Sequence, residues 1–350
     1  MSSFLCRSLG RAAVALCGIL LLAAFPPRVR AQGTYVVADA TSGHVLEGRG
    51  QRDKRQVASL TKIATALVVL DWCDMRKVNL GELVAIPAQA VRADSTNPIG
   101  FQPGDRVSVR DLIFCMMLQS DNIAAEALAI HFGPQLPGDP SLTPMQRFVQ
   151  QMNALARSLR MDRTLFLNPN GIDNVEQPYS TALDMARLTK AAISKGSFRF
   201  FVTQKERRIS IVRAGAASPS PANYPVPGQP SSTAAPAAAA PPPAPPQAPP
   251  ATTEYLLRNT NELLGRNEID GVKTGQTNRA GGCLVISATK PPIAKQIGKE
   301  TQVWPRRLIV VVLGSPDRFN EALGLLQRGW TEFDQWSAEG RKMGDIKSEL

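Results

Sequence analysis

Residues 57–62 read VASLTK and lead directly into the apolar run IATALVVL of residues 63–70. In a helix, Ser59 and Lys62 project from one face because they are three residues apart. A serine hydroxyl becomes a nucleophile when a neighbour takes its proton, and lysine can do so only where burial or a second cation favours the neutral amine. The pair therefore predicts a nucleophile beside its base. The alternative, from this motif alone, is a helix-capping serine near an exposed lysine.

Two later stretches carry polar side chains in comparable settings. Residues 120–122 read Ser-Asp-Asn and separate the apolar run 112–118 from the helical pattern of residues 123–130. Residues 273–275 read Lys-Thr-Gly and precede the strand-like segment 283–288. Ser-x-x-Lys, Ser-x-Asn and Lys-Thr-Gly in this chain order are the signature of penicillin-binding proteins and serine β-lactamases.

From about residue 35 to about residue 330 the chain resembles the D-alanyl-D-alanine carboxypeptidases, the low-molecular-weight penicillin-binding proteins. The resemblance rests on ASLTKI (58–63), MLQS (117–120), FLNPNG (166–171), YSTA (179–182) and DGVKTGQT (270–277). It implies a serine enzyme that removes the terminal D-Ala from peptidoglycan stem peptides through an acyl-enzyme. Such an enzyme is inhibited by β-lactam antibiotics and uses no cofactor.

The resemblance also implies catalytic roles. Ser59 is expected to attack the carbonyl of the D-Ala-D-Ala bond, while Lys62, kept neutral by the positive charge of Lys273, accepts its proton. Ser120 is expected to relay that proton to the leaving amine. The Asn122 side chain is expected to hold the substrate amide.

The remaining expected contacts bind the substrate. The oxyanion requires fixed donors, which the family takes from the backbone N–H groups of the nucleophile and of Gln276. Lys273 and Thr274 are the expected donors to the terminal carboxylate, with Gly275 between them and the oxyanion site. Arg318 matches an arginine that the family uses near this carboxylate, and the alternative is a surface arginine at a helix start.

Two positions depart from the family pattern. Asp121 stands where relatives often have glycine, and it is expected to point into solvent. Thr260 stands where some relatives carry an arginine, which leaves carboxylate recognition partly open.

Competing functions differ in what the sequence supplies. A class A β-lactamase activates water with a Glu-x-x-Leu-Asn element, and none occurs between Ser120 and Lys273. A DD-endopeptidase cuts peptidoglycan crosslinks after the same D-alanine, so the sequence does not separate it from a carboxypeptidase. A non-catalytic cell-wall binding protein would not need all of the motif side chains.

Composition excludes other chemistries. The chain has two histidines, His44 and His131, and neither follows a nucleophile-elbow pattern or joins a metal-binding pattern. We therefore expect no Ser-His-Asp triad and no metal site. The basic and aromatic residues do not interleave as they do in nucleic-acid modules, so no nucleic acid is expected as a partner.

The first 31 residues have the pattern of a secretory signal peptide. Arg7 and Arg11 precede an uncharged apolar run at residues 12–25, and Val-Arg-Ala at 29–31 precedes a predicted cut at Gln32. The protein is therefore expected in the periplasm or cell envelope, and an uncleaved anchor is the alternative. Removing these residues takes away four arginines and no acid, which lowers the formal net charge from +11 to +7. A basic surface suits weak association with the cell wall or membrane, and the chain's end near residue 350 suggests no C-terminal anchor.

The element pattern predicts an α+β fold of the β-lactamase/transpeptidase type. Strands are expected at both ends of the chain, with an all-helical lobe at about residues 71–195 between them, so both ends should share one antiparallel sheet. A groove between sheet and lobe would bring the three motifs together. The expected strands are 35–38, 44–46, 269–274, 283–289 and 308–313, and the expected helices are 107–118, 123–132, 145–159, 181–193 and 318–336. The catalytic domain is placed at residues 32–340, with a tail at 341–350.

Residues 214–251 interrupt this plan. They hold thirteen of the chain's 28 prolines, mixed with alanine and almost without charge. Such a segment has too little apolar bulk to form a core and is predicted to be extended or disordered. We interpret it as an inert insertion in a surface loop, with a docking site for a partner as the alternative.

Overall fold

The chain is described here from a computed structural model. The structure describes residues 33–92, 96–173, 175, 177–214, 251–297, 299–341 and 349–350. The predicted signal peptide, nearly all of the proline-rich insertion and most of the C-terminal tail lie outside the described residues. These three assignments stay predictions.

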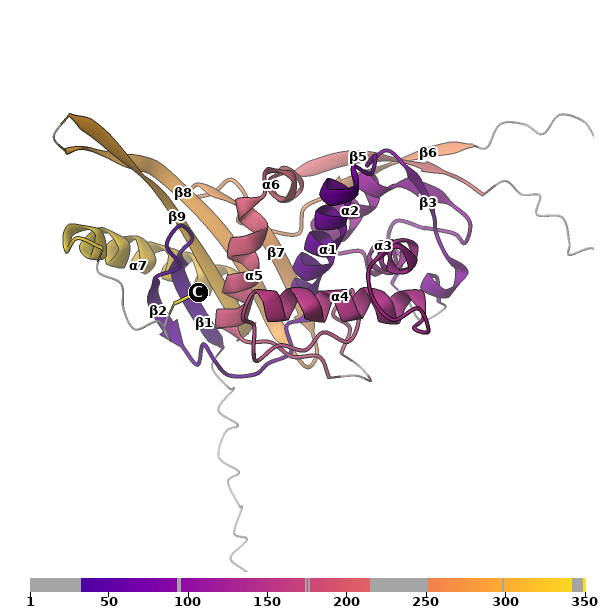
Figure 1. Cartoon of the computed structure of the whole chain (residues 1–350), viewed down its shortest axis with the longest axis horizontal. Helices are drawn as coiled ribbons and strands as arrows, with labels where there is room; N and C mark the ends of the chain where they lie inside the picture. Colours follow the sequence, from indigo (N-terminus) through magenta and orange to yellow (C-terminus); the bar gives the residue numbers. More distant parts are fainter. Residues whose placement is uncertain are drawn as a thin grey trace, which may run out of the picture. The chain divides into compact units, whose positions relative to one another are not determined.

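The main sheet is antiparallel and is built from both ends of the chain, as predicted (Figure 1). Its strand order is β2-β1-β9-β8-β7. The strands are β1 (Thr34–Asp39), β2 (Val45–Arg49), β7 (Ile269–Thr277), β8 (Gly281–Ile297) and β9 (Glu300–Ser315). The last two are longer than predicted, because they continue as a paired hairpin beyond the buried residues. β7, which carries the Lys-Thr-Gly motif, is an edge strand.

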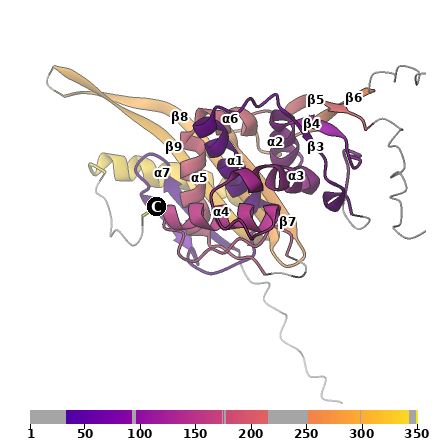
Figure 2. The same ribbon diagram turned by 45° about the vertical axis from the view of Figure 1, so that its right-hand side comes forward.

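Helices cover both faces of this sheet, which explains its nearly continuous apolar strands. Neighbouring residues of β1 point to opposite faces: Val36 packs into the larger core with the helical lobe, and Val37 packs into the core beneath α7. The larger core is formed with α1 (Lys62–Arg76), α2 (Val109–Leu118), α3 (Asn122–Phe132), α4 (Pro144–Ser158), α5 (Ala182–Ser194) and α6 (Gly196–Val202). On the other face lies α7 (Arg318–Ala338), as Figure 2 shows from a second side. The predicted helices are confirmed within two residues, whereas α6 was not predicted.

A second antiparallel sheet was not predicted. Its order is β3-β4-β5-β6, formed by β3 (Leu83–Ala85), β4 (Arg106–Ser108), β5 (Glu206–Val212) and β6 (Thr252–Arg258). In the sequence, the proline-rich segment lies between β5 and β6. The Arg213 N–H donates to the carbonyl oxygen of Ala251 at 2.9 Å, so the two ends of the insertion are held side by side.

The helix after the nucleophile motif is a core helix. Every residue of α1 from Lys62 to Leu70 is buried, as expected of a helix that is apolar all round. It follows the short 3₁₀ turn η1 (Ala58–Thr61). Two further 3₁₀ turns are η2 (Ala88–Ala90) and η3 (Gly133–Gln135). None of the helices in the described ranges is long and apolar enough to span a bilayer.

Candidate active site

The predicted nucleophile lies on a tight turn between the sheet and α1. Ser59 is in η1, and the preceding Ala58 has a left-handed backbone with φ of 49°. The edge strand β7 passes so close that a Cβ atom on Gly275 would lie 3.1 Å from the Ser59 backbone nitrogen. Only glycine permits this approach without movement of the turn. The glycine of the third motif thus allows close packing against the first motif.

The Lys62 amine makes three polar contacts. Its Nζ lies 2.9 Å from Ser59 Oγ, 2.7 Å from Asn122 Oδ1 and 2.7 Å from the carbonyl oxygen of Asn170. The last two atoms can only accept hydrogen bonds. When the amine is neutral, its two N–H groups are therefore donated to Asn122 and Asn170, and its lone pair faces the Ser59 hydroxyl. This is the arrangement that proton transfer from serine to lysine requires.

Burial favours the neutral form of this amine. The Lys62 side chain is completely buried, and burial lowers its pKa from 10.5 to about 7, against the opposing charges of Asp121 and Glu126. The sequence predicts that the charge of Lys273 keeps Lys62 neutral. This prediction was wrong about the main cause, because the lowered pKa of Lys62 comes chiefly from burial of the amine. A lysine at this pKa can act as a base near neutral pH.

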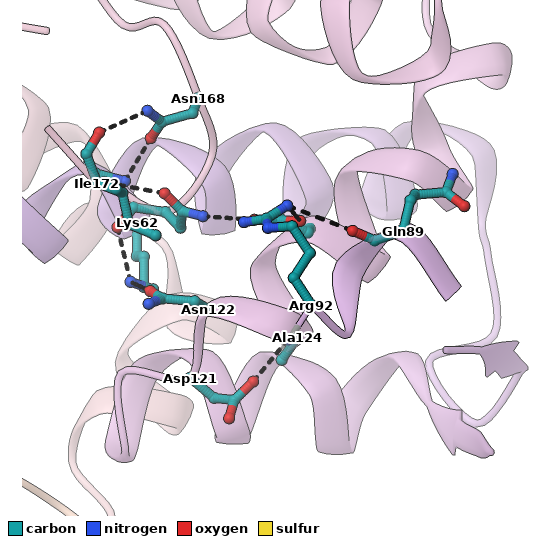
Figure 3. Close-up of polar contacts among 11 residues, drawn as sticks. Lys62, Gln89, Arg92, Asp121, Asn122, Ala124, Asn168 and Ile172 are labelled. Carbon is teal, nitrogen blue, oxygen red and sulfur yellow. Dashed lines mark hydrogen bonds and ion pairs between the residues drawn. The ribbon is translucent and has the colours of Figure 1, made fainter. Parts of the chain in front are cut away.

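The second motif lies where α2 ends and α3 begins. Ser120 has a left-handed backbone with φ of 62°, which turns the chain between the two helices. Asn122 is the first residue of α3 and points at Lys62 (Figure 3). The prediction that Asp121 points into solvent was wrong, because its carboxylate is buried and caps α3 by accepting the Ala124 N–H at 2.7 Å. Burial raises the pKa of Asp121 to about 6.

The third motif presents a second buried amine on β7. Lys273 is 1% exposed, and its Nζ donates to the carbonyl oxygen of Thr274 at 3.0 Å. Burial is the main cause that holds the pKa of Lys273 well below its usual value, and the charges of Lys62 and Arg318 lower it further. β7 is an edge strand that pairs with β8 on one side and lies beside the nucleophile turn.

The residues predicted to bind the carboxylate meet along β7. Arg318 Nη1 donates to Gln276 Oε1 at 2.7 Å and to the Gly275 carbonyl oxygen at 3.3 Å. The arginine that α7 begins with is thus held on the motif strand, rather than extended into solvent. Thr260 lies 2.7 Å from Thr274, hydroxyl to hydroxyl, and its own hydroxyl also donates to the Leu118 carbonyl oxygen at 3.1 Å. Thr260 therefore links the third motif to the end of α2, near the second.

Three residues of the site were not predicted. The loop after α4 supplies the Asn170 carbonyl, and the side-chain Nδ2 of Asn170 donates to Glu126 Oε1 at 2.8 Å. Arg92 pairs with both oxygens of Glu126. A sequence signal existed for Glu126, which is the only charged residue between Ile123 and Ile130. Among the described residues, no group of three or more His, Cys, Asp and Glu side chains could hold a metal ion.

A serine hydroxyl that faces a buried amine, beside an edge strand with its own buried amine, defines a serine acyl-transfer enzyme. Residues 22–218 and 245–297 match the sequence profile described as D-alanyl-D-alanine carboxypeptidase, and the chain belongs to this family of serine hydrolases, as the sequence motifs predicted. The DacD carboxypeptidase of Escherichia coli (strain K12) is 29% identical over 331 residues, which cover 91% of this chain and 68% of that protein.

Two other similar proteins carry different activity names. The D-alanyl-D-alanine endopeptidase of Pseudomonas aeruginosa is 30% identical over 263 residues, which cover 74% of this chain and 67% of that protein. The crystal structure of the Streptomyces K15 DD-transpeptidase has a TM-score of 0.64 and 26% sequence identity, covering 85% of this chain and 96% of that one. The predicted transpeptidase-like fold is confirmed.

Proposed function

We propose that Ser59 is the nucleophile and Lys62 the general base of a D-alanyl-D-alanine carboxypeptidase. Ser59 Oγ attacks the carbonyl carbon of the terminal D-Ala-D-Ala bond as its proton passes to Lys62 Nζ. Breaking the C–N bond leaves an acyl-enzyme on Ser59, and water then releases the shortened peptide. The observation that carries this proposal is the contact of the buried Lys62 Nζ with Ser59 Oγ at 2.9 Å, beside two acceptors, Asn122 Oδ1 and the Asn170 carbonyl oxygen.

The leaving D-alanine needs a proton on its nitrogen. Ser120 stands two residues before Asn122, at the turn into α3, and we assign it the relay of the proton from Lys62 to that nitrogen. Asn122 contacts the amine through Oδ1, which leaves its Nδ2 group for the substrate amide carbonyl. The second motif thus serves the base and the substrate together.

The oxyanion and the carboxylate are assigned to groups on β7 and α7. The backbone N–H groups of Ser59 and Gln276 would stabilise the negative charge on the carbonyl oxygen. Lys273, Thr274 and Arg318 would bind the terminal carboxylate. Support comes from the contact of Arg318 with Gln276, which keeps the guanidinium on the strand that the substrate would follow.

The endopeptidase is the second candidate function. It is favoured by the 30% identity to the Pseudomonas aeruginosa endopeptidase, which is as high as the identity to the DacC carboxypeptidase of Escherichia coli. Both reactions break the bond after a D-alanine, and they differ in the amine that leaves. The predicted export signal supports action on peptidoglycan in the cell envelope, with β-lactams as acylating inhibitors of Ser59.

The test is a mass-resolved digest. Purified residues 32–350 are incubated with a pentapeptide muropeptide and, separately, with a crosslinked muropeptide dimer, with Ser59→Ala as the control. Loss of one alanine from the monomer is expected of a carboxypeptidase, whereas cleavage of the dimer alone would assign the endopeptidase. If neither substrate changed, or if Ser59→Ala cut as fast as the natural protein, the proposed mechanism would be wrong.

A further inference from the structure

A buried carboxylate lies behind the proposed base. Glu126 is 6% exposed and accepts a hydrogen bond from Asn170 Nδ2 at 2.8 Å. The Arg92 guanidinium donates to both of its oxygens, at 3.1 and 3.2 Å. We propose that Glu126 and Arg92 are a positioning pair that holds Asn170 against Lys62 and balances the charge around that amine. This inference rests on the proposed role of Lys62 as the general base.

Hydrogen bonds fix the turn that carries Asn170. Its side-chain Oδ1 accepts the Ile172 N–H at 2.9 Å while its Nδ2 donates to Glu126, so both ends of the carboxamide are bound. The neighbouring Asn168 accepts the Gly171 N–H at 2.7 Å and donates to the Ile172 carbonyl oxygen at 2.8 Å (Figure 3). The turn cannot rotate without breaking these bonds, and the Asn170 carbonyl therefore stays directed at Lys62.

Helix α3 positions both acceptors of the Lys62 amine. Asn122 and Glu126 are four residues apart on this helix and share one face. Asn122 contacts Lys62 directly, and Glu126 contacts it through Asn170. One rigid helix face thus sets both acceptors that receive the N–H groups of the neutral amine. Loss of the Glu126 contact would free one acceptor while the other stayed in place.

The charges around Lys62 oppose one another. The negative charges of Asp121 and Glu126 favour its protonated form, whereas burial favours the neutral form. Lys273 on β7 is also buried and interacts electrostatically with Lys62. Arg92 pairs with Glu126 and offsets part of its negative charge. Without Arg92, the Glu126 charge would act on Lys62 more strongly, because both carboxylate oxygens would lose their cationic partner.

Two substitutions, each of which removes one charge of the pair, should move the pKa of Lys62 in opposite directions. Arg92→Gln removes the cation, so Lys62 would stay protonated to a higher pH. The acid limb of the pH profile of acylation, where the rate rises as Lys62 loses its proton, should therefore move to higher pH. Glu126→Gln keeps an oxygen for Asn170 but leaves the cation unbalanced, so the limb should shift downward. We expect shifts of about half a pH unit to one unit in each direction. Arg92→Lys, which restores the charge, should bring the limb back toward its original position.

The measured quantity is the second-order rate constant for acylation of the protein by a fluorescent penicillin between pH 5 and pH 9. Arg328→Gln is the matched control, because Arg328 also makes two bonds to one carboxylate, Glu47, and lies on α7 on the other side of the sheet. This control should leave the limb unchanged. Thermal unfolding of each variant checks that it is folded.

Opposite shifts in the two variants would support the pair. Unchanged limbs, or a uniform loss of rate at every pH, would overturn it. If Glu126→Gln does not fold, Arg92→Gln decides alone, because Arg92 is half-exposed. Failure of the proposed function has a different signature, in which the natural protein is not acylated or is acylated away from Ser59.

Discussion

Replacing Lys62 by methionine should make the protein inactive and change how its stability depends on pH. Methionine has a similar length and no charge, so it fits the site while removing the amine. In the folded protein, burial lowers the pKa of Lys62 from 10.5 to about 7. A pKa difference of this size corresponds to about 5 kcal/mol of folding free energy that the natural protein loses by burying the amine.

The sign of the pH dependence follows from the same values. The unfolded chain keeps the ordinary pKa of 10.5, and the folded chain has a pKa of about 7. Between these two values the unfolded state binds more protons, so the free energy of unfolding of the natural protein rises with pH. The stability gained by removing the buried amine is therefore largest below pH 7 and disappears near pH 10.5. Between pH 7 and pH 9 it should shrink by about 2–3 kcal/mol.

Urea unfolding of both proteins at pH 7, 8 and 9 measures this change. The variant also loses the hydrogen bonds to Asn122 and Asn170, which cost about 1–3 kcal/mol each, but this cost is the same at every pH and cancels in the trend. Ser59→Ala keeps the buried amine, so its stability difference from the natural protein should stay flat. A flat difference for Lys62→Met as well would refute the argument that Lys62 is neutral in the folded enzyme.

Three further changes test other parts of the site. In Gly171→Ala, the new Cβ would overlap the Ala58 carbonyl oxygen, so penicillin acylation should fall more than tenfold and the melting temperature should drop. Gly340→Ala is the control, because Gly340 has a similar φ of 85° and nothing within 4 Å of the added Cβ. This control should lose only about 1–2 kcal/mol of stability from backbone strain. Arg318→Gln should raise KM about tenfold or more for a peptide with a free terminal carboxylate, and little for its amide, and equal effects on both would contradict the assigned role. Deletion of residues 218–250 should leave kcat/KM within about twofold, because the paired strands β5 and β6 hold the ends together, and a large loss would mean that the insertion takes part in activity.

The candidate catalytic motifs were recognised from their chain order and from the family resemblance, and the segments around them show their place in the fold. Ser59 and Lys62 precede an apolar core helix, and Lys273 lies on a strand with apolar neighbours, so their approximate positions follow from local sequence. The shared sheet was also predictable, since strand patterns occur at both ends of the chain. The edge strand β7 of this sheet lies against the turn that carries Ser59, and Gly275 allows this contact.

The rest of the site depends on groups that no residue type marks. Asn170 contacts the base through its backbone carbonyl, and every residue has one. Asp121 was placed wrongly, although aspartate before a helical segment is a common N-cap. The second sheet was missed because β3 and β4 have only three residues each, and because the insertion separates β5 from β6 in the sequence.

Ser59 as the site of acylation is the central claim, and peptide mapping tests it most directly. The natural protein is incubated with benzylpenicillin near pH 8, quenched in acid and digested with trypsin, and the adduct is located by fragment-ion mass spectrometry. Cleavage after Arg55 and Lys62 gives a peptide of residues 56–62, in which Ser59 and Thr61 are the only hydroxyl side chains. We predict a penicilloyl group on Ser59 and none in Lys62→Met. An adduct on Thr61 or on another peptide, or full labelling of Lys62→Met, would contradict the mechanism.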